Sequence, residues 1–130
     1  MIVLDAGVLI GYLDGTDAHH AAAYSLLTHA VDDDLAANAL TLAEVLVAPA
    51  RAGRLEPVLD ALTALELQEL AVPVNLSAHL ARLRVDTGLR MPDCCVLLSA
   101  ELTGAGVASF DRRLTRAAAQ RGLDVFDGLP

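Results

Sequence analysis

The sequence contains no lysine, and its nine basic side chains are all arginine. A Walker A phosphate-binding loop and catalysis through a Schiff base both require lysine, so both kinds of chemistry are excluded. The 17 acidic residues give a formal net charge of −8, so the chain lacks the broad basic surface that usually gathers nucleic acid. Any polyanionic substrate would therefore need local help from metal ions or from a few arginines.

Long apolar runs, spaced cysteines and a leader segment are also missing. The longest uncharged run, residues 18–31, contains three histidines and is shorter than the roughly 18 residues that cross a bilayer. No basic segment precedes the apolar N-terminus, so we expect no signal peptide. Cys94 and Cys95 are adjacent, a spacing that neither closes a loop nor matches a metal site. We therefore expect a soluble, cytoplasmic protein without membrane association.

Aromatic residues make up only 3% of the chain, so a core must be built from alanine, leucine and valine. We expect one domain over residues 1–130. Short apolar strands alternate with amphipathic helices, which predicts an α/β fold with helices on both faces of a parallel sheet. The expected strands cover residues 1–4, 35–39, 69–74, 106–110 and 123–126. The expected helices cover residues 8–13, 41–52, 55–67, 77–87, 92–102 and 111–120, with a further helix that Thr16 or Asp17 caps and that ends near residue 31.

Two features of these helices carry further expectations. Pro49 lies inside the predicted helix 41–52, so it should kink that helix or end it early. The next helix has an apolar stripe at helical spacing, and such leucine-rich stripes exceed what one modest sheet needs. We therefore expect part of this stripe to face a partner chain. Its residues are Leu55, Val58, Leu59, Leu62 and Leu65.

Four acidic residues, Asp5, Glu44, Asp93 and Asp111, stand where a strand gives way to a helix or where a helix begins. In a parallel α/β sheet these junctions share one edge, where such folds bind their ligands. Mg²⁺ and Mn²⁺ prefer carboxylate oxygens, and a metal bound there could activate water and stabilise charge on a phosphoryl group. Without a cation the carboxylates would repel one another. A divalent metal therefore explains such a cluster better than acid–base catalysis alone.

Each acid also has a structural explanation. Acidic residues at helix N-termini cap free N–H groups and complement the helix dipole. Thr41 and Glu44 match a capping box, while Asp93 and Asp111 would fit as acids of a first helical turn. Asp5 is harder to explain in this way because Ala-Gly after it is a poor helix start. Spacing alone leaves the structural and functional interpretations open.

The acids lie within four short motifs that occur in a fixed order along nearly the whole chain. These motifs are Val3-Leu4-Asp5, Leu42-Ala43-Glu44-Val45, Met91-Pro92-Asp93-Cys94 and Ala108-Ser109-Phe110-Asp111. Together they resemble the four acidic motifs of PIN-domain nucleases. The length and the segment Asp17-Ala18-His19-His20 are most similar to the VapC toxins of bacterial toxin–antitoxin pairs.

The resemblance implies a PIN-like three-layer α/β/α fold around a parallel sheet of about five strands. It also implies an endoribonuclease that depends on Mg²⁺ or Mn²⁺ and leaves a 5′-phosphate and a 3′-hydroxyl. Asp5, Asp93 and Asp111 would be metal ligands, and Glu44 would bind a metal or position water. The expected partners are RNA, a second copy of the chain in a homodimer, and a small cognate antitoxin that covers the acidic site.

The chain departs from the family pattern at three places. Gly7 replaces the usual Ser, Thr or Asn two residues after the first acid, so a polar contact to metal or water is missing. Cys94 replaces the usual alanine after the third acid, and an acid sometimes present a few residues after Asp111 is absent. Gly7 favours an alternative function, a catalytically weakened PIN-fold module that mainly binds a protein partner. Ser109, in contrast, provides the small hydroxyl that commonly precedes the fourth acid.

Histidine and arginine offer weaker functional hypotheses. His19, His20, His29 and His79 could suggest a metal-free ribonuclease, which uses a histidine acid–base pair. Adjacent histidines on a helix point about 100° apart, so we interpret them as polar surface residues. Arginines of the predicted helix 111–120 could contact RNA phosphates or simply face solvent. They are Arg112, Arg113 and Arg116.

Overall fold

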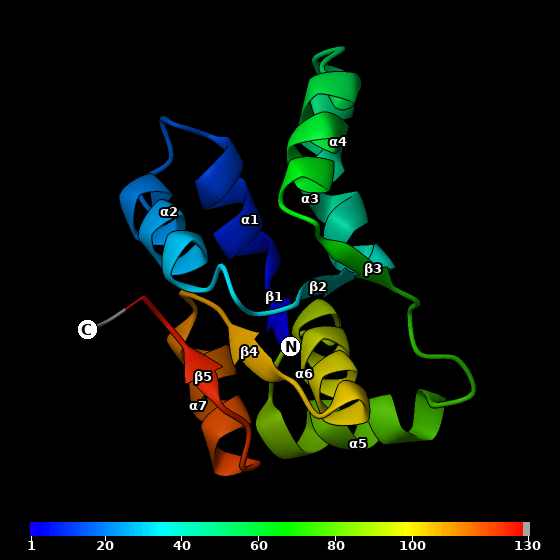
Figure 1. The fold of residues 1–130 in the computed structure, drawn as a ribbon. Helices are drawn as coiled ribbons and strands as arrows, with labels where there is room; N and C mark the ends of the chain where they lie inside the picture. Colours follow the sequence, from blue (N-terminus) through cyan, green and yellow to red (C-terminus); the bar gives the residue numbers. More distant parts are fainter. Residues whose placement is uncertain (129–130) are drawn as a thin grey trace.

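A five-stranded sheet, in which every strand pair is parallel, forms the centre of the computed structural model, which describes residues 1–128. The strand order is β3-β2-β1-β4-β5, so the first strand lies in the middle and β3 and β5 form the edges (Figure 1). The strands are β1 (Ile2–Leu4), β2 (Leu35–Asn38), β3 (Gln68–Leu70), β4 (Gly106–Ala108) and β5 (Val125–Phe126). All five predicted strands are confirmed, including the alanine-rich β2 and the edge position of β3.

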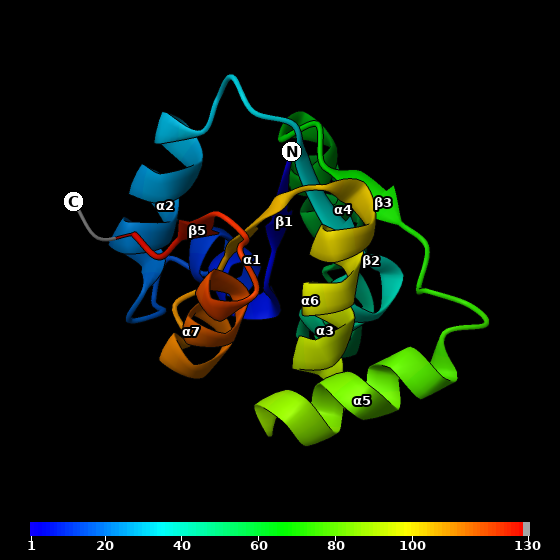
Figure 2. The same cartoon turned by 90° about the horizontal axis from the view of Figure 1, so that it is seen from below.

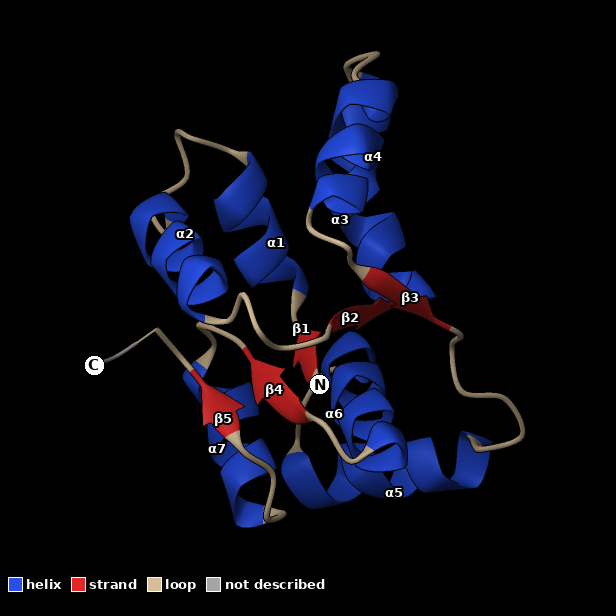
Figure 3. Cartoon of the chain, in the orientation of Figure 1, coloured by secondary structure: helices blue, strands red, loops and turns tan. Residues whose placement is uncertain are grey.

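Seven helices in the described residues cover both faces of the sheet. They are α1 (Ala6–Leu13), α2 (His20–His29), α3 (Ala39–Arg51), α4 (Leu55–Ala64), α5 (Ser77–Thr87), α6 (Met91–Thr103) and α7 (Arg112–Gln120). Helices α1 to α4 pack on one face and α5 to α7 on the other, so the strands form a band between two groups of helices (Figure 3). Figure 2 shows α5 lying across α6. The predicted α/β/α architecture is confirmed.

Alternate residues of each central strand supply the two cores. Ile2 and Leu4 of β1 belong to the core under α1 to α4, whereas Val3 between them belongs to the core under α5 to α7. Val107 and Ala108 of β4 divide in the same way. Because side chains alternate across a strand, a strand buried on both faces must be apolar throughout. That requirement explains why the first residues of the chain carry no polar side chain before Asp5.

The start of α3 differs from the expected capping box. Asn38, the last residue of β2, caps this helix because its Oδ1 accepts a hydrogen bond of 2.8 Å from the backbone N of Thr41. Its Nδ2 donates to the hydroxyl of Ser99 on α6 at 3.3 Å, so both ends of the fully buried amide are bonded. The helix therefore begins at Ala39. Thr41 lies inside its first turn and is not the N-cap, so Thr41 and Glu44 do not form a capping box.

The limits of two other helices also bear on the sequence prediction. Helix α2 begins at His20, because Asp14 and Asp17 accept hydrogen bonds from Thr16 and His19 in a turn before the helix. Helix α3 continues through Pro49 to Arg51, so the expectation of an early end was wrong. Proline removes only one hydrogen-bond donor, and near a C-terminus few following turns depend on it.

The apolar stripe of α4 is partly used within the chain. Leu62 is buried, and Val58 and Leu65 pack against the same core. Leu55 and Leu59 are half-buried and supply the more accessible part of the stripe. No helix among residues 1–128 is both long enough and apolar enough to cross a membrane.

Candidate active site

A pocket of about 340 Å³ at the carboxyl edge of the sheet contains all four predicted acids, Asp5, Glu44, Asp93 and Asp111. Asp5 follows β1 and caps α1, and Asp111 follows β4 and caps α7. Glu44 lies on α3, which follows β2, and Asp93 lies in the first turn of α6. Side chains that are up to 106 residues apart in sequence (111 − 5) therefore share one pocket, as the sequence analysis expected.

Asp5 is the best-fixed acid of the pocket. Its Oδ1 accepts a hydrogen bond of 2.8 Å from the backbone N of Ala6, and its Oδ2 accepts one of 2.8 Å from the hydroxyl of Ser109. Burial raises the pKa of Asp5 above its ordinary value, and the charge of Asp111 raises it further. The two hydrogen bonds and the positive charge of Arg90 act in the opposite direction, because they favour the ionised form.

Ser109 connects the first and fourth acids. Its hydroxyl is fully buried, donates to Asp5, and accepts a hydrogen bond of 3.0 Å from the backbone N of Asp111. Asp111 in turn accepts a hydrogen bond of 2.9 Å from the backbone N of Arg113. The ends of β1 and β4 are therefore held in one relative position by side-chain bonds, which fixes the direction of both carboxylates.

Asp93 and Glu44 make no helix-capping hydrogen bond, although Asp93 lies in the first turn of α6. Among residues 1–128 neither side chain accepts a hydrogen bond, although the Asp93 residue is only 8% exposed. Burial is the largest cause of the raised pKa of Asp93, followed by the charges of Asp5 and Asp111. Arg90 lowers this pKa and Glu44 raises it. A buried carboxylate that faces three other acids lacks an adequate counter-charge.

The donor set fits a hard divalent cation, because four oxygen-donor side chains line one pocket and repel one another. Within the described chain, however, no three His, Cys, Asp or Glu side chains are grouped closely enough to hold a metal ion as they stand. Asp5 and Asp111 are held by hydrogen bonds, whereas Asp93 and Glu44 are not. These two are therefore the side chains that can turn toward a shared cation.

Three residues of the pocket were not assigned to it from the sequence, although His19 and Phe110 lie in segments that were singled out there. Arg90, His19 and Phe110 line it together with the acids. Arg90 makes no hydrogen bond or ion pair through its side chain within residues 1–128, so its charge is available to a ligand. Its place directly before Met-Pro-Asp was the available sequence signal. The arginines at 112, 113 and 116 do not line the pocket, and Arg113 donates instead to the carbonyl of Gly88 at 3.1 Å.

The fold and the pocket together define an α/β/α protein with an acidic ligand site at the carboxyl edge of its parallel sheet. The sequence profile of the PIN domain matches residues 2–120. The chain therefore belongs to the PIN domain family, whose members are generally nucleases. This result confirms the resemblance that the four acidic motifs indicated.

Solved structures share the fold at low sequence identity. FitAcB from Neisseria gonorrhoeae is 20% identical, with a TM-score of 0.75 over 98% of each chain. VapC20 from Mycobacterium tuberculosis, a toxin that cleaves the sarcin–ricin loop, is 15% identical with a TM-score of 0.73 over 90% of this chain and 95% of its own. VapBC2 from Rickettsia felis, bound to a promoter DNA fragment, is 14% identical with a TM-score of 0.71 over 96% and 97%. A comparison with curated proteins gives no match.

Proposed function

We propose that this protein is a divalent-metal-dependent endoribonuclease that acts as the toxin of a toxin–antitoxin pair. The observation that carries the proposal is the presence of Asp5, Glu44, Asp93 and Asp111 in one pocket of a PIN-family fold. Like charges are costly to hold together, so a fold that buries Asp93 against other acids needs a compensating cation. The structurally similar toxin VapC20 from M. tuberculosis cleaves the sarcin–ricin loop, which supports RNA as the substrate.

In this proposal Asp5, Asp93 and Asp111 hold Mg²⁺ or Mn²⁺, and Glu44 binds a metal or orients water. The cation would activate the attacking water and offset the charge that develops on the phosphoryl group. The hydroxyl of Ser109 donates to Asp5 and so favours its ionised form, which opposes the effect of burial on its pKa. The uncommitted guanidinium of Arg90 is placed to contact a phosphate oxygen at the same edge.

The proposed partners are a small antitoxin and a second copy of the chain, acting in the cytoplasm. Support for the antitoxin comes from relatives of the same fold, including a toxin–antitoxin complex from Klebsiella pneumoniae that is 20% identical with a TM-score of 0.72 over 85% of this chain and 87% of its own. The accessible part of the α4 stripe, Leu55 and Leu59, remains our candidate for a partner-facing surface.

Purified protein incubated with structured RNA tests the proposal. We expect cleavage with Mn²⁺ or Mg²⁺, loss of cleavage with excess chelator, and 5′-phosphate ends on the products. For substitutions of the four acids to the matching amide, the control is Asp60→Asn, which removes one exposed acid on α4 that lies outside the pocket. Cleavage that persists in chelator would contradict a metal-dependent mechanism. Tight binding of a protein partner without cleavage of any RNA would favour the alternative of a weakened binding module.

Substitution of Gly7 tests whether the missing polar side chain limits activity. Gly7 lines the pocket, and a Cβ built there would meet no atom within 4 Å, so a larger residue fits without a clash. We expect Gly7→Ser to cleave several-fold faster than Gly7→Ala, because only serine supplies a hydroxyl. Both variants should be more stable than the parent by about 0.5–1 kcal/mol, since glycine is a poor helix residue. Equal rates in the two variants would show that no polar contact is missing.

A further inference from the structure

Two aromatic rings are stacked at the rim of the acidic pocket. The ring centroids of His19 and Phe110 lie 4.8 Å apart, with an angle of 16° between the planes. His19 directly precedes α2, and Phe110 lies between Ser109 and the fourth acid, Asp111. Both rings line the same pocket as the carboxylates. The stack therefore stands directly beside the place where a scissile phosphate would bind.

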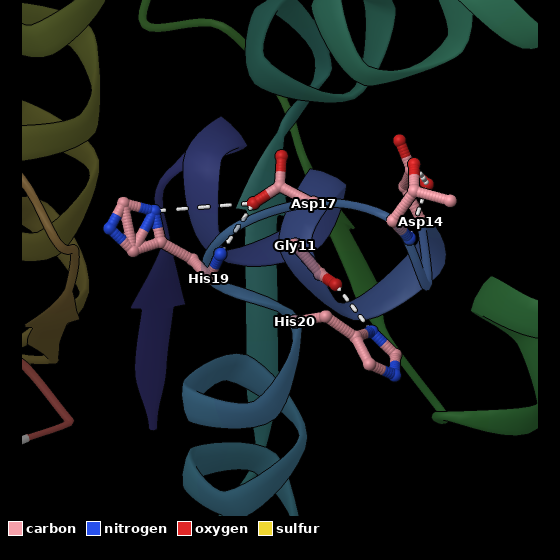
Figure 4. A network of polar contacts seen from close by, with 6 residues as sticks. Gly11, Asp14, Asp17, His19 and His20 are labelled. Carbon is pink, nitrogen blue, oxygen red and sulfur yellow. Dashed lines mark hydrogen bonds and ion pairs between the residues drawn. The ribbon is translucent and has the colours of Figure 1, made fainter.

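The stack is supported on one side and open on the other. Phe110 packs against the core, and a methyl group added to Gly128 would come within 3.0 Å of its Cε1, so that part of the ring is covered. The side chain of His19 is 58% exposed. Asp17 fixes its backbone, because Oδ1 accepts a hydrogen bond of 2.8 Å from the His19 N and lies 4.0 Å from Nδ1 (Figure 4). A flat, oriented ring thus presents one face to solvent.

The other histidines have structural partners. His20 makes a hydrogen bond of 2.8 Å from Nδ1 to the carbonyl of Gly11, and Figure 4 shows its ring pointing away from that of His19. His29 bonds to the carbonyl of Ser25 at 2.7 Å, and His79 faces Glu101 at 3.8 Å. His19 differs from these three because its ring lines the acidic pocket while its side chain stays largely exposed, which leaves one face of the ring open to a ligand.

We propose that the open face of His19 stacks on the unpaired nucleobase next to the scissile phosphate, an inference that rests on the proposed RNA cleavage. Proteins read single-stranded RNA by stacking unpaired bases on aromatic side chains, histidine included. Stacking is also the attraction that an acidic chain can supply, because a net charge of −8 opposes the phosphate backbone but not the face of a base. Arg90 then contacts phosphate while Phe110 keeps the imidazole flat against the pocket. The preferred substrate is consequently a loop or single strand rather than a duplex.

Three substitutions of His19 separate stacking from other roles of an imidazole. With a short single-stranded oligoribonucleotide, we expect His19→Ala and His19→Gln to raise KM roughly 5- to 100-fold with little change in kcat, the range that the loss of one stacked base gives. His19→Phe should stay within a few-fold of the parent, because it keeps the ring and loses only the nitrogens. The control is Tyr24→Ala, which removes an exposed aromatic side chain of α2 that lies outside the pocket. A defect in His19→Phe as large as in His19→Ala would overturn the proposal.

A binding measurement distinguishes this inference from the proposed function. The sequence contains no tryptophan, so His19→Trp places a single fluorescent reporter in the stack. We expect an oligonucleotide to quench it, and one with an abasic site beside the cleaved bond to quench it much less. Tyr24→Trp serves as the control. Quenching without any cleavage would contradict the proposed nuclease activity and support the base contact. Cleavage without quenching, together with an unchanged KM in His19→Ala, would contradict the base contact alone.

Discussion

Asp93→Asn is expected to slow RNA cleavage by about 10³-fold, equivalent to roughly 4 kcal/mol of transition-state stabilisation, and to make the metal-free protein more stable. The first effect follows if Asp93 is a metal ligand, because an amide lacks the charge that attracts a divalent cation. The second follows from its surroundings, since Asp93 is buried and faces the charges of Asp5 and Asp111. The same carboxylate would thus support catalysis and weaken the fold.

The sign of the stability effect follows from the raised pKa of Asp93. A group whose pKa is higher in the folded than in the unfolded state contributes stability at low pH, and this contribution is lost as pH rises through the folded value. Above the folded pKa the ionised carboxylate therefore destabilises the fold, and asparagine removes that charge without a large change in volume. Thermal denaturation in chelator should give a higher Tm for Asp93→Asn than for the parent protein.

Adding Mn²⁺ should reverse the order of stability. Ligand that binds only the folded state stabilises it by mass action, about 2.7 kcal/mol at 100 times the dissociation constant. The parent should gain this increment, and Asp93→Asn should gain much less of it. Asp60→Asn, an exposed acid on α4, should behave as the parent does in both conditions. Unchanged cleavage by Asp93→Asn, or an equal Mn²⁺ shift in both proteins, would contradict the role of Asp93 as a ligand.

The positions of the four acids were predictable because chain order fixes them. A buried strand such as β1 can be recognised from its apolar residues, and in a parallel sheet the residue after it lies at the ligand-binding edge. Asp5 and Asp111 follow directly from this rule. Asp93 follows less directly, because α6 comes after another helix rather than after a strand, although its first turn lies at the same edge. Here the family resemblance added what topology alone leaves open.

The rest of the pocket was not predictable because it depends on side-chain direction. His19 and Phe110 meet only after α2 has packed beside α1 and the segment after β4 has turned toward it, and neither sequence neighbourhood indicates the other ring. In the sequence, Arg90 resembles any exposed arginine in a loop. The structure distinguishes it, because Arg84 and Arg113 donate to the backbone carbonyls of Leu89 and Gly88, just before Arg90, whereas the side chain of Arg90 lines the pocket. Local patterns indicate which segments form helices and strands, whereas the pairing of exposed side chains requires the tertiary structure.

Asn38 shows how a local pattern can mislead. Thr41 and Glu44 have the spacing of a capping box, yet the helix begins two residues before Thr41 because Asn38 caps it from the end of β2. A buried asparagine at the last position of a strand has a poor strand propensity, and that is the sequence signal for its role. The consequence for function is that Glu44 is released from capping and remains available to the pocket.

Asn38→Ala is expected to lower the free energy of unfolding by about 2–3 kcal/mol. Loss of a helix N-cap costs roughly 1 kcal/mol, and leaving buried polar groups without their partners adds about 1–2 kcal/mol. The backbone N of Thr41 and the hydroxyl of Ser99 are both buried and both lose their bond to Asn38. At roughly 4 °C for each kcal/mol, Tm should fall by about 10 °C. Urea denaturation and thermal scans measure the two quantities independently.

A double-mutant cycle with Ser99→Ala divides this loss between the cap and the bond to α6. Ser99→Ala removes the 3.3 Å contact and leaves the cap intact, so its cost should be the smaller one. The double variant should be less destabilised than the sum, because the two residues share a bond that is lost only once. Strict additivity would show that Asn38 acts on α3 alone. Since Glu44 lies six residues after Asn38 on the same helix (44 − 38), a loosened first turn of α3 should also reduce cleavage at temperatures well below Tm.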